Sequence, residues 1–264
     1  MSVHPTAIVD PLAVIDPTAT IGPYVIIAGA VRVGADCRIA ASAVILGHTE
    51  IGAGCRIHSH AVVGDVPQDR AFQGAESYCR IGEGCIIREG ATVHRGTMPG
   101  STTIVGNRCM LMTNSHVAHN CVLGDDVLII SGVLLGGHVQ IGAKAVIAGG
   151  AAVHQFVRIG ELAMVSGMAK VVQDVPPYFL TDRDGSIVGE NRVGLLRARL
   201  PRVERDEIKA AFHIIYRSGL GRDEALAELR SSLSTAAGLQ LLKFMEADSK
   251  RGVRRESISI RRAA

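Results

Sequence analysis

Three histidines lie close together in one stretch of the chain, residues 112–140: His116, His119 and His138. A neutral imidazole can take a proton from a hydroxyl group near pH 7, so each of them could act as a general base. The residue type alone does not choose among them, because most histidines in proteins are structural. We favour His119, which lies at the centre of the stretch.

The same stretch contains Gly136 and Gly137 directly before His138. Backbone N–H groups without a side chain in front of them can stabilise the oxyanion of a tetrahedral intermediate. Glycine also fits a tight corner, and the spacing alone favours that simpler role.

A metal site is the competing interpretation of the histidines. The nearby cysteines and carboxylates are not arranged in a way that supports it, and Asn120 stands where a ligand could have been, so we predict no metal.

A six-residue repeat must position these side chains. Aliphatic residues recur every six positions over residues 3–63, 81–93 and 105–171. This period fits neither an α-helix nor simple strand alternation and is typical of a parallel β-helix, in which three sides form one coil. His119 and His138 are 19 residues apart, about one coil, so we expect them on neighbouring coils at the same edge.

Composition agrees with such a fold and excludes other classes. Of the 264 residues 47% are hydrophobic but only 3% aromatic, so small aliphatic side chains must build the core. The net charge of +3 is too small to indicate nucleic acid. We see no signal peptide and no apolar run long enough for a membrane span, and we expect a cytoplasmic protein with reduced thiols. The cysteines at one fixed place in the hexad, which we interpret as small buried side chains, are Cys37, Cys55, Cys85, Cys109 and Cys121.

Two breaks in the repeat, residues 64–80 and 96–103, predict loops that leave the coil. Loops on a rigid scaffold often carry function, and the first one has a polar cluster around Asp69. The repeat ends at a pair of prolines. We therefore predict a β-helix over 1–178 and an α-helical C-terminal domain over 179–264. The predicted helices cover 191–200, 202–217, 223–233 and 239–245, and we expect the basic residues from Ser249 onward to be frayed.

Several motifs resemble those of a known family. They are Gly47-His48-Thr49, Gln68-Asp69, Val93-His94-Arg95-Gly96-Thr97, His116-Val117-Ala118-His119, Gly137-His138-Val139, Val153-His154-Gln155-Phe156, Gln173-Asp174-Val175-Pro176-Pro177-Tyr178 and Ile215-Tyr216-Arg217-Ser218-Gly219. Together they resemble the UDP-N-acetylglucosamine O-acyltransferases of lipid A biosynthesis. The resemblance implies a left-handed β-helix, whereas the sequence itself does not determine the handedness.

The resemblance also implies a reaction, in which a (3R)-hydroxyacyl chain moves from acyl carrier protein to the 3-hydroxyl of UDP-N-acetylglucosamine. His119 matches the general base, and the Gly137 N–H matches the oxyanion donor. Met164 and Gly167 match the acyl-chain pocket. The positions that match substrate contacts are Asp69, His116, His138, His154, Gln155, Asn191 and Arg197. The family implies a homotrimer with active sites between subunits, and no cofactor beyond the carrier-protein thioester as co-substrate.

The chain departs from the family pattern at Ala71, Asn120 and Val193. Asn120 replaces an aspartate that would follow the catalytic histidine. Two alternatives stay open at this stage. One is acylation of a related acceptor, such as a 3-amino sugar nucleotide or another nucleotide sugar. The other is a non-catalytic or zinc-binding trimeric β-helix.

Overall fold

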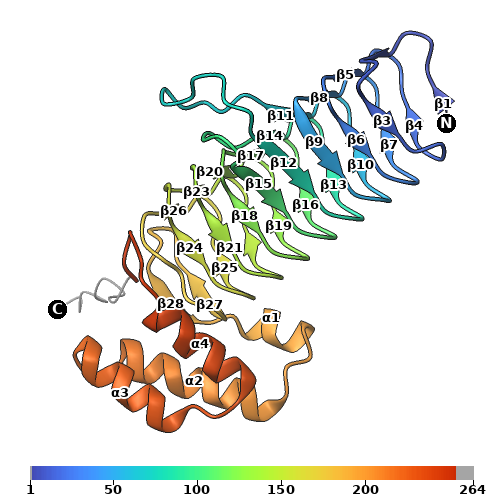
Figure 1. The fold of residues 1–264 in the computed structure, drawn as a ribbon. Coiled ribbons are helices and arrows are strands. Elements are labelled where there is room, and N and C mark those ends of the chain that lie inside the picture. Colours follow the sequence, from blue (N-terminus) through green and yellow to red (C-terminus); the bar gives the residue numbers. More distant parts are fainter. Residues whose placement is uncertain (1, 254–264) are drawn as a thin grey trace.

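The computed structural model describes residues 2–253. Short strands stack into three flat parallel sheets that run along one long axis, and four helices pack at the C-terminal end (Figure 1). Each turn of the chain around the axis adds one strand to each sheet. The coils form a left-handed parallel β-helix, as predicted.

The strands are named here in the order in which they stack. The first sheet contains β1 (Ser2–Val3), β4 (Thr20–Ile21), β7 (Arg38–Ile39), β10 (Arg56–Ile57), β13 (Ile86–Ile87), β16 (Met110–Leu111), β19 (Leu128–Ile129), β22 (Val146–Ile147), β25 (Met164–Val165), β27 (Phe179–Thr181) and β28 (Ile187–Glu190). The second sheet contains β2 (Ile8–Val9), β5 (Ile26–Ala28), β8 (Val44–Leu46), β11 (Val62–Asp65), β14 (Thr92–His94), β17 (His116–Val117), β20 (Leu134–Leu135), β23 (Ala152–Val153) and β26 (Lys170–Val171). The third sheet contains β3 (Val14–Ile15), β6 (Arg32–Val33), β9 (His48–Ile51), β12 (Tyr78–Ile81), β15 (Thr102–Val105), β18 (Val122–Leu123), β21 (Gln140–Ile141) and β24 (Arg158–Ile159).

The register of the strands explains the repeat. Leu123 pairs with Ile141, and Ile141 pairs with Ile159, so one coil takes 18 residues. These aliphatic side chains point inward and are buried, because each coil covers its apolar face only against the coils above and below it. The glycine after the aliphatic residue has a steric cause. A Cβ on Gly124 would lie 2.7 Å from the backbone nitrogen of Ala143 in the next coil.

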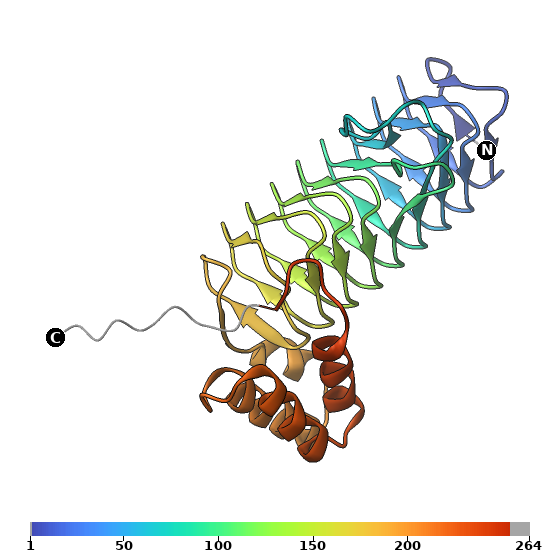
Figure 2. The same ribbon diagram turned by 60° about the vertical axis from the view of Figure 1, so that its left-hand side comes forward.

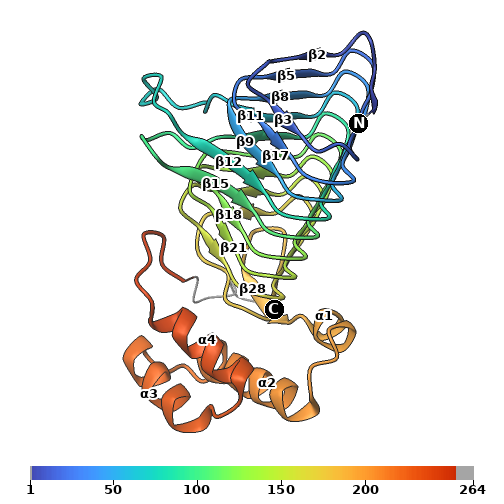
Figure 3. The same ribbon diagram turned by 45° about the vertical axis from the view of Figure 1, so that its right-hand side comes forward.

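Two loops leave the coil near the breaks in the repeat. Residues 66–77 join β11 to β12, and residues 95–101 join β14 to β15. Across the first loop Ile51 pairs with Ile81, 30 positions away instead of 18, and across the second loop Ile81 pairs with Val105, 24 positions away. From Val105 to Leu123 the spacing is 18 again. The first loop projects from the same side of the β-helix in two views (Figures 1 and 3). It lies next to the second sheet, in the coils just before His119.

All six cysteines are buried and free. Five of them donate their thiol hydrogen to the carbonyl of a glycine in the next coil, for example Cys37 to Gly52 at 3.1 Å and Cys121 to Gly136 at 3.2 Å. They are small buried side chains of the core, as the hexad position predicted.

The C-terminal segment begins with two further strands before the helices. β27 and β28 extend the first sheet beyond residue 178, so the division at 178 stays a prediction. The helices are α1 (Arg192–Arg197), α2 (Arg202–Tyr216), α3 (Arg222–Ser232) and α4 (Ala236–Glu246). α4 begins earlier than predicted, because the Thr235 hydroxyl caps it by accepting from Gly238 N at 3.1 Å. Phe179 packs against Phe212 of α2 at 5.7 Å between ring centres and anchors the helices to the β-helix.

One expectation about the C-terminus is wrong. Residues 249–253, expected to be frayed, return from α4 to the last coils of the β-helix (Figure 2). Asp174 N donates to Gly252 O at 2.8 Å, and Val253 forms a bridge with Asp174. The remainder of the basic tail lies outside the described residues. Within residues 2–253, no helix has the length and apolar character needed to cross a membrane.

Candidate active site

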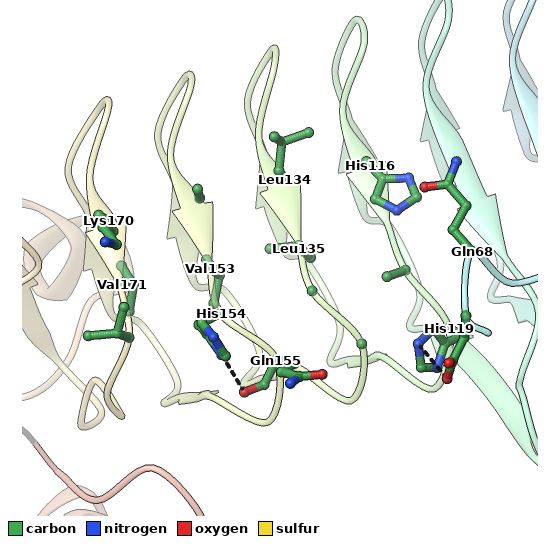
Figure 4. A pocket seen from close by; sticks show the side chains of 16 residues that line it. Gln68, His116, His119, Leu134, Leu135, Val153, His154, Gln155, Lys170 and Val171 are labelled. Carbon is green, nitrogen blue, oxygen red and sulfur yellow. Dashed lines mark hydrogen bonds and ion pairs between the residues drawn. The ribbon is translucent and has the colours of Figure 1, made fainter. Parts of the chain in front are cut away.

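A groove of about 780 Å³ runs along the outer face of the second sheet and the corner that leads to the third sheet. The outward residues of four successive strands form its floor: His116, Leu134, Ala152 and Lys170. Figure 4 shows this row of coils, with His119 at the adjoining corner and Gln68 of the first loop beside it. Six of the predicted site residues line the groove, namely Asp69, His116, His119, Gly137, His154 and Gln155.

His119 is held in one orientation by Asn120. The His119 Nδ1 lies 3.0 Å from the Asn120 Oδ1. That oxygen also accepts from the backbone N–H of Thr97 at 3.0 Å, which fixes which end of the amide is the oxygen. Since the Asn120 Oδ1 can only accept, Nδ1 of His119 must carry the hydrogen, and Nε2 is left with a free lone pair. Asn120 thus orients the His119 ring, a role for which the family pattern led us to expect an aspartate.

Asp69 comes from the first loop and faces the other nitrogen of the same ring. Its Oδ2 lies 3.6 Å from the His119 Nε2, and the histidine side chain is only 12% exposed. Ala71 N donates to Oδ1 of Asp69 at 3.0 Å, which orients the carboxylate. At 3.6 Å the interaction is electrostatic rather than a hydrogen bond. It therefore stabilises the imidazole most when the ring has taken up a proton.

Gly137 lies one coil beyond His119 and keeps the space beside its ring open. A Cβ at position 137 would lie 2.5 Å from the His119 Nε2, so any other residue would fill this space. The Gly137 carbonyl accepts from Phe156 N at 3.0 Å. Among residues 2–253 its own N–H donates to no protein acceptor. A backbone N–H without a protein acceptor, on a residue beside an imidazole, is a group that can stabilise an oxyanion.

Burial favours the neutral form of two neighbouring histidines, His116 and His138. Burial lowers the pKa of His116 to about 4, and repulsion from His94 and His119 acts in the same direction. Burial also lowers the pKa of His138. Nδ1 of His116 lies 2.7 Å from the Thr92 hydroxyl. Neutral rings at the edge of a groove can exchange hydrogen bonds with the hydroxyls of a sugar.

His138 does not line the main groove. It lies in an adjoining cavity of about 560 Å³, together with Phe156 and Lys250. Its ring makes an edge contact with that of His119, with 5.3 Å between the centres, which confirms that the two histidines lie on neighbouring coils at one edge. Within residues 2–253 no cluster of three or more histidine, cysteine or carboxylate side chains is arranged to hold a metal ion.

Comparison with known proteins identifies the family. A family model of UDP-N-acetylglucosamine O-acyltransferase, domain 2, matches residues 174–254, and models of bacterial transferase hexapeptide (six repeats) and of a GMPPB C-terminal domain match residues 102–137 and 3–98. The acyl-[acyl-carrier-protein]–UDP-N-acetylglucosamine O-acyltransferase of Syntrophobacter fumaroxidans is 39% identical over 256 residues, which are 96% of this chain and 99% of that protein. The chain belongs to this family.

Solved structures agree. The UDP-N-acetylglucosamine O-acyltransferase of Moraxella catarrhalis has a TM-score of 0.92 at 38% identity, covering 97% of this chain and 100% of that one. The acyltransferase of Bacteroides fragilis has a TM-score of 0.92 at 34% identity, covering 96% and 100%. The family resemblance seen in the motifs is thereby confirmed.

Four residues that the family pattern assigns to substrates lie away from the groove of a single acyltransferase chain. Asn191 caps α1, where its Oδ1 accepts from Gly194 N at 3.0 Å and its Nδ2 donates to Leu162 O at 2.8 Å. Arg197 is exposed in the last turn of α1. Met164 lies in β25 of the first sheet, and Gly167 is exposed at the corner that follows it. One chain does not bring these residues to His119, and their roles stay predictions.

Sequence reasoning missed part of the groove of this acyltransferase. Leu134, Ala152 and Lys170 follow His116 at intervals of one coil. Counting 18 residues at a time from His116 would have found all three. The contact between Asp69 and His119 has no such signal, because the path of the first loop is not periodic.

Proposed function

We propose that this acyltransferase moves a (3R)-hydroxyacyl chain from acyl carrier protein to the 3-hydroxyl of UDP-N-acetylglucosamine, with His119 as the general base. One observation carries the role of His119. Its Nδ1–H is committed to Asn120, and its free Nε2 faces the space that Gly137 keeps open. Family membership supports the substrates, since the Syntrophobacter fumaroxidans relative carries this activity in its name.

In the proposed reaction, Nε2 of His119 takes the proton as the sugar oxygen attacks the thioester carbonyl. A carbon–oxygen bond forms, and the N–H of Gly137 donates to the oxyanion. Asp69, 3.6 Å from Nε2, stabilises the imidazolium while the intermediate exists. The carbon–sulfur bond then breaks, and the imidazolium returns its proton to the departing thiol of the carrier protein. General base catalysis supplies about 10²–10⁴ of the rate, and positioning in the groove supplies a further part.

The other predicted residues fit a site that is shared between copies of the chain. We propose a homotrimer in which Asn191, Arg197, Met164 and Gly167 act across the boundary between subunits, since one chain leaves them away from His119. An exposed arginine such as Arg197 suits the diphosphate of a nucleotide sugar. The reaction as proposed needs no cofactor other than the thioester co-substrate.

Mass spectrometry of the product tests the proposed substrates. The enzyme is incubated with UDP-N-acetylglucosamine and a mixed pool of 3-hydroxyacyl carrier proteins. We expect one ester, and its mass gives the chain length that the acyl pocket selects. A parallel reaction uses the 3-amino analogue of the sugar nucleotide. Product from the amine alone would overturn the hydroxyl assignment in favour of the amine alternative.

A further inference from the structure

Residues 247–253, which we call the strap, leave α4 and run back to the corner between the second and third sheets (Figure 2). The Ser249 hydroxyl accepts from the backbone N–H groups of Arg251 at 3.1 Å and Gly252 at 2.8 Å, which gives the strap a fixed turn. Gly252 and Val253 join the strap to Asp174. The Asp174 carboxylate is fully buried and accepts from Arg158 Nε at 2.7 Å. The strap is therefore tied to a rigid part of the β-helix.

The strap lies near the end of the β-helix, where the regular hydrogen bonds between successive coils stop. Along this corner each coil donates one backbone N–H to the coil before it: His138 N to His119 O, and Phe156 N to Gly137 O, both at 3.0 Å. The next bond of the series would run from Asp174 N to Gln155 O. Asp174 N instead donates to Gly252 O, and Gln155 O accepts from the Arg251 Nε at 2.7 Å. The guanidinium thus replaces the N–H that Asp174 gives to the strap.

The carbonyl that Arg251 binds belongs to the wall of the groove. Gln155 and His154 both line it. Nδ1 of His154 lies 3.3 Å from the same Gln155 carbonyl. Without Arg251 this carbonyl would keep only the contact with His154 and solvent. Arg251 therefore fixes the backbone of the corner from which two predicted substrate contacts project.

The neighbouring strap residue reaches the histidine edge from the same side. The Lys250 ammonium lies 4.1 Å from the centre of the Phe156 ring. Phe156 in turn stacks on His138 at 4.6 Å with an interplanar angle of 15°. His138 makes its edge contact with His119. One column of packed rings therefore joins the strap to the proposed base.

We propose that the strap supports the wall of the substrate groove, and that Arg251 is a positioning residue for acyl transfer that acts through Gln155 and His154. This inference rests on the proposed function. The proposal gives a positioning role to a segment that the sequence predicted to be frayed. Arg251 touches neither the proposed base nor the reacting atoms, and its effect is on the placement of substrate.

Steady-state kinetics of Arg251→Ala test the role. We expect KM for the sugar nucleotide or the carrier protein to rise roughly tenfold, the equivalent of one lost hydrogen bond of about 1.4 kcal/mol, with a smaller change in kcat. Arg251→Lys keeps a donor and a charge, and we expect it to recover most of the loss. The matched control is Arg202→Ala, because Arg202 is exposed on α2 and, among residues 2–253, forms only a surface ion pair with Asp206.

Histidine NMR of the same variants gives a readout that does not depend on turnover. We expect the His154 ring signals to shift in Arg251→Ala, to return toward the wild-type position in Arg251→Lys and to stay unchanged in Arg202→Ala. Absence of ester formation by the wild-type enzyme would refute the proposed function, whatever the spectra show. An active wild type together with an Arg251→Ala variant of normal KM and unshifted His154 signals would refute the role of the strap.

Discussion

At the scale of single residues, the site depends on which nitrogen of His119 carries the hydrogen. Asn120 settles this through an amide whose oxygen is identified by the Thr97 N–H. The aspartate expected after the proposed base would accept the same hydrogen bond and add a negative charge. In this chain the charge comes from Asp69, on the opposite side of the ring. With Asn120 in place of the expected aspartate, His119 therefore keeps the same tautomer, and a carboxylate lies on the other side of the ring.

Substitutions at Asn120 separate orientation from charge. In Asn120→Ala the Nδ1–H loses its acceptor, and we expect kcat to fall about tenfold, in line with one lost hydrogen bond. In Asn120→Asp the acceptor stays, so we expect a kcat closer to that of the wild type than the alanine variant has. Equal kcat values for the alanine variant and the wild type would contradict the orienting role.

The lowered pKa of His116 predicts how the free energy of unfolding depends on pH. Its pKa is lowered to about 4 in the folded protein, mainly by burial, against about 6.5 in an unfolded chain. Between these values the unfolded chain binds a proton that the folded chain does not. Stability is thus fully present above about pH 6.5 and falls as the pH drops toward about 4.

Urea unfolding at about pH 7.5 and pH 5 measures this dependence. His116→Gln removes the titrating ring, so we expect its midpoint to fall less between the two pH values than that of the wild type. Thr92, which contacts His116 Nδ1, stays in place in both proteins. An identical fall in both would show that His116 does not carry the effect.

At the scale of elements, the sequence predicted the regular parts of the fold and missed the irregular contacts. The aliphatic side chains of the hexads, such as Leu123 and Ile141, are buried in the β-helix. A six-residue period brings all of them to the inside of the coils. The site residues on the coils, His119 and Gly137, could be placed by counting. Asp69 and Arg251 could not be placed by counting. They lie in a loop and in a terminal segment that have no periodicity, so the sequence does not predict where their side chains point.

The first loop gives the prediction at this scale. Asp69→Asn keeps the size of the side chain and removes its charge, so the imidazolium loses its stabilising partner. We expect kcat to fall by about tenfold or more, with the largest loss at low salt, because a partly exposed charge is screened by ions. Asp36→Asn is the control, since Asp36 lies at a corner in an early coil, far from the groove in sequence and fold. A salt-independent rate in Asp69→Asn equal to that of the wild type would count against this contact.

At the scale of the whole molecule, a single chain holds only part of the predicted site. The groove with His119 lies along the second sheet, whereas Met164 lies in the first sheet and Arg197 on α1. Three flat faces allow a chain to pack against two copies of itself around a three-fold axis. The predicted homotrimer would bring the separated residues to one place.

Mixing two inactive variants tests this arrangement. His119→Ala and Arg197→Ala are each expected to lose most activity as pure proteins. When they are co-expressed, about a quarter of the sites between subunits should combine an intact His119 with an intact Arg197 from the neighbour. We therefore expect activity to return to that fraction of the wild-type level. No recovery in verified mixed oligomers would place both residues in a site within one chain.

The measurement that tests the central proposal most directly is the single-turnover rate of acyl transfer by His119→Ala, with UDP-N-acetylglucosamine and the preferred 3-hydroxyacyl carrier protein. Because His119→Ala loses the hydrogen bond to Asn120, thermal unfolding of the variant is measured alongside to verify that it is folded. If Nε2 of His119 is the base, the rate falls by about 10²–10⁴. A folded His119→Ala enzyme whose rate stays within about threefold of the wild type, far short of that loss, would contradict the account.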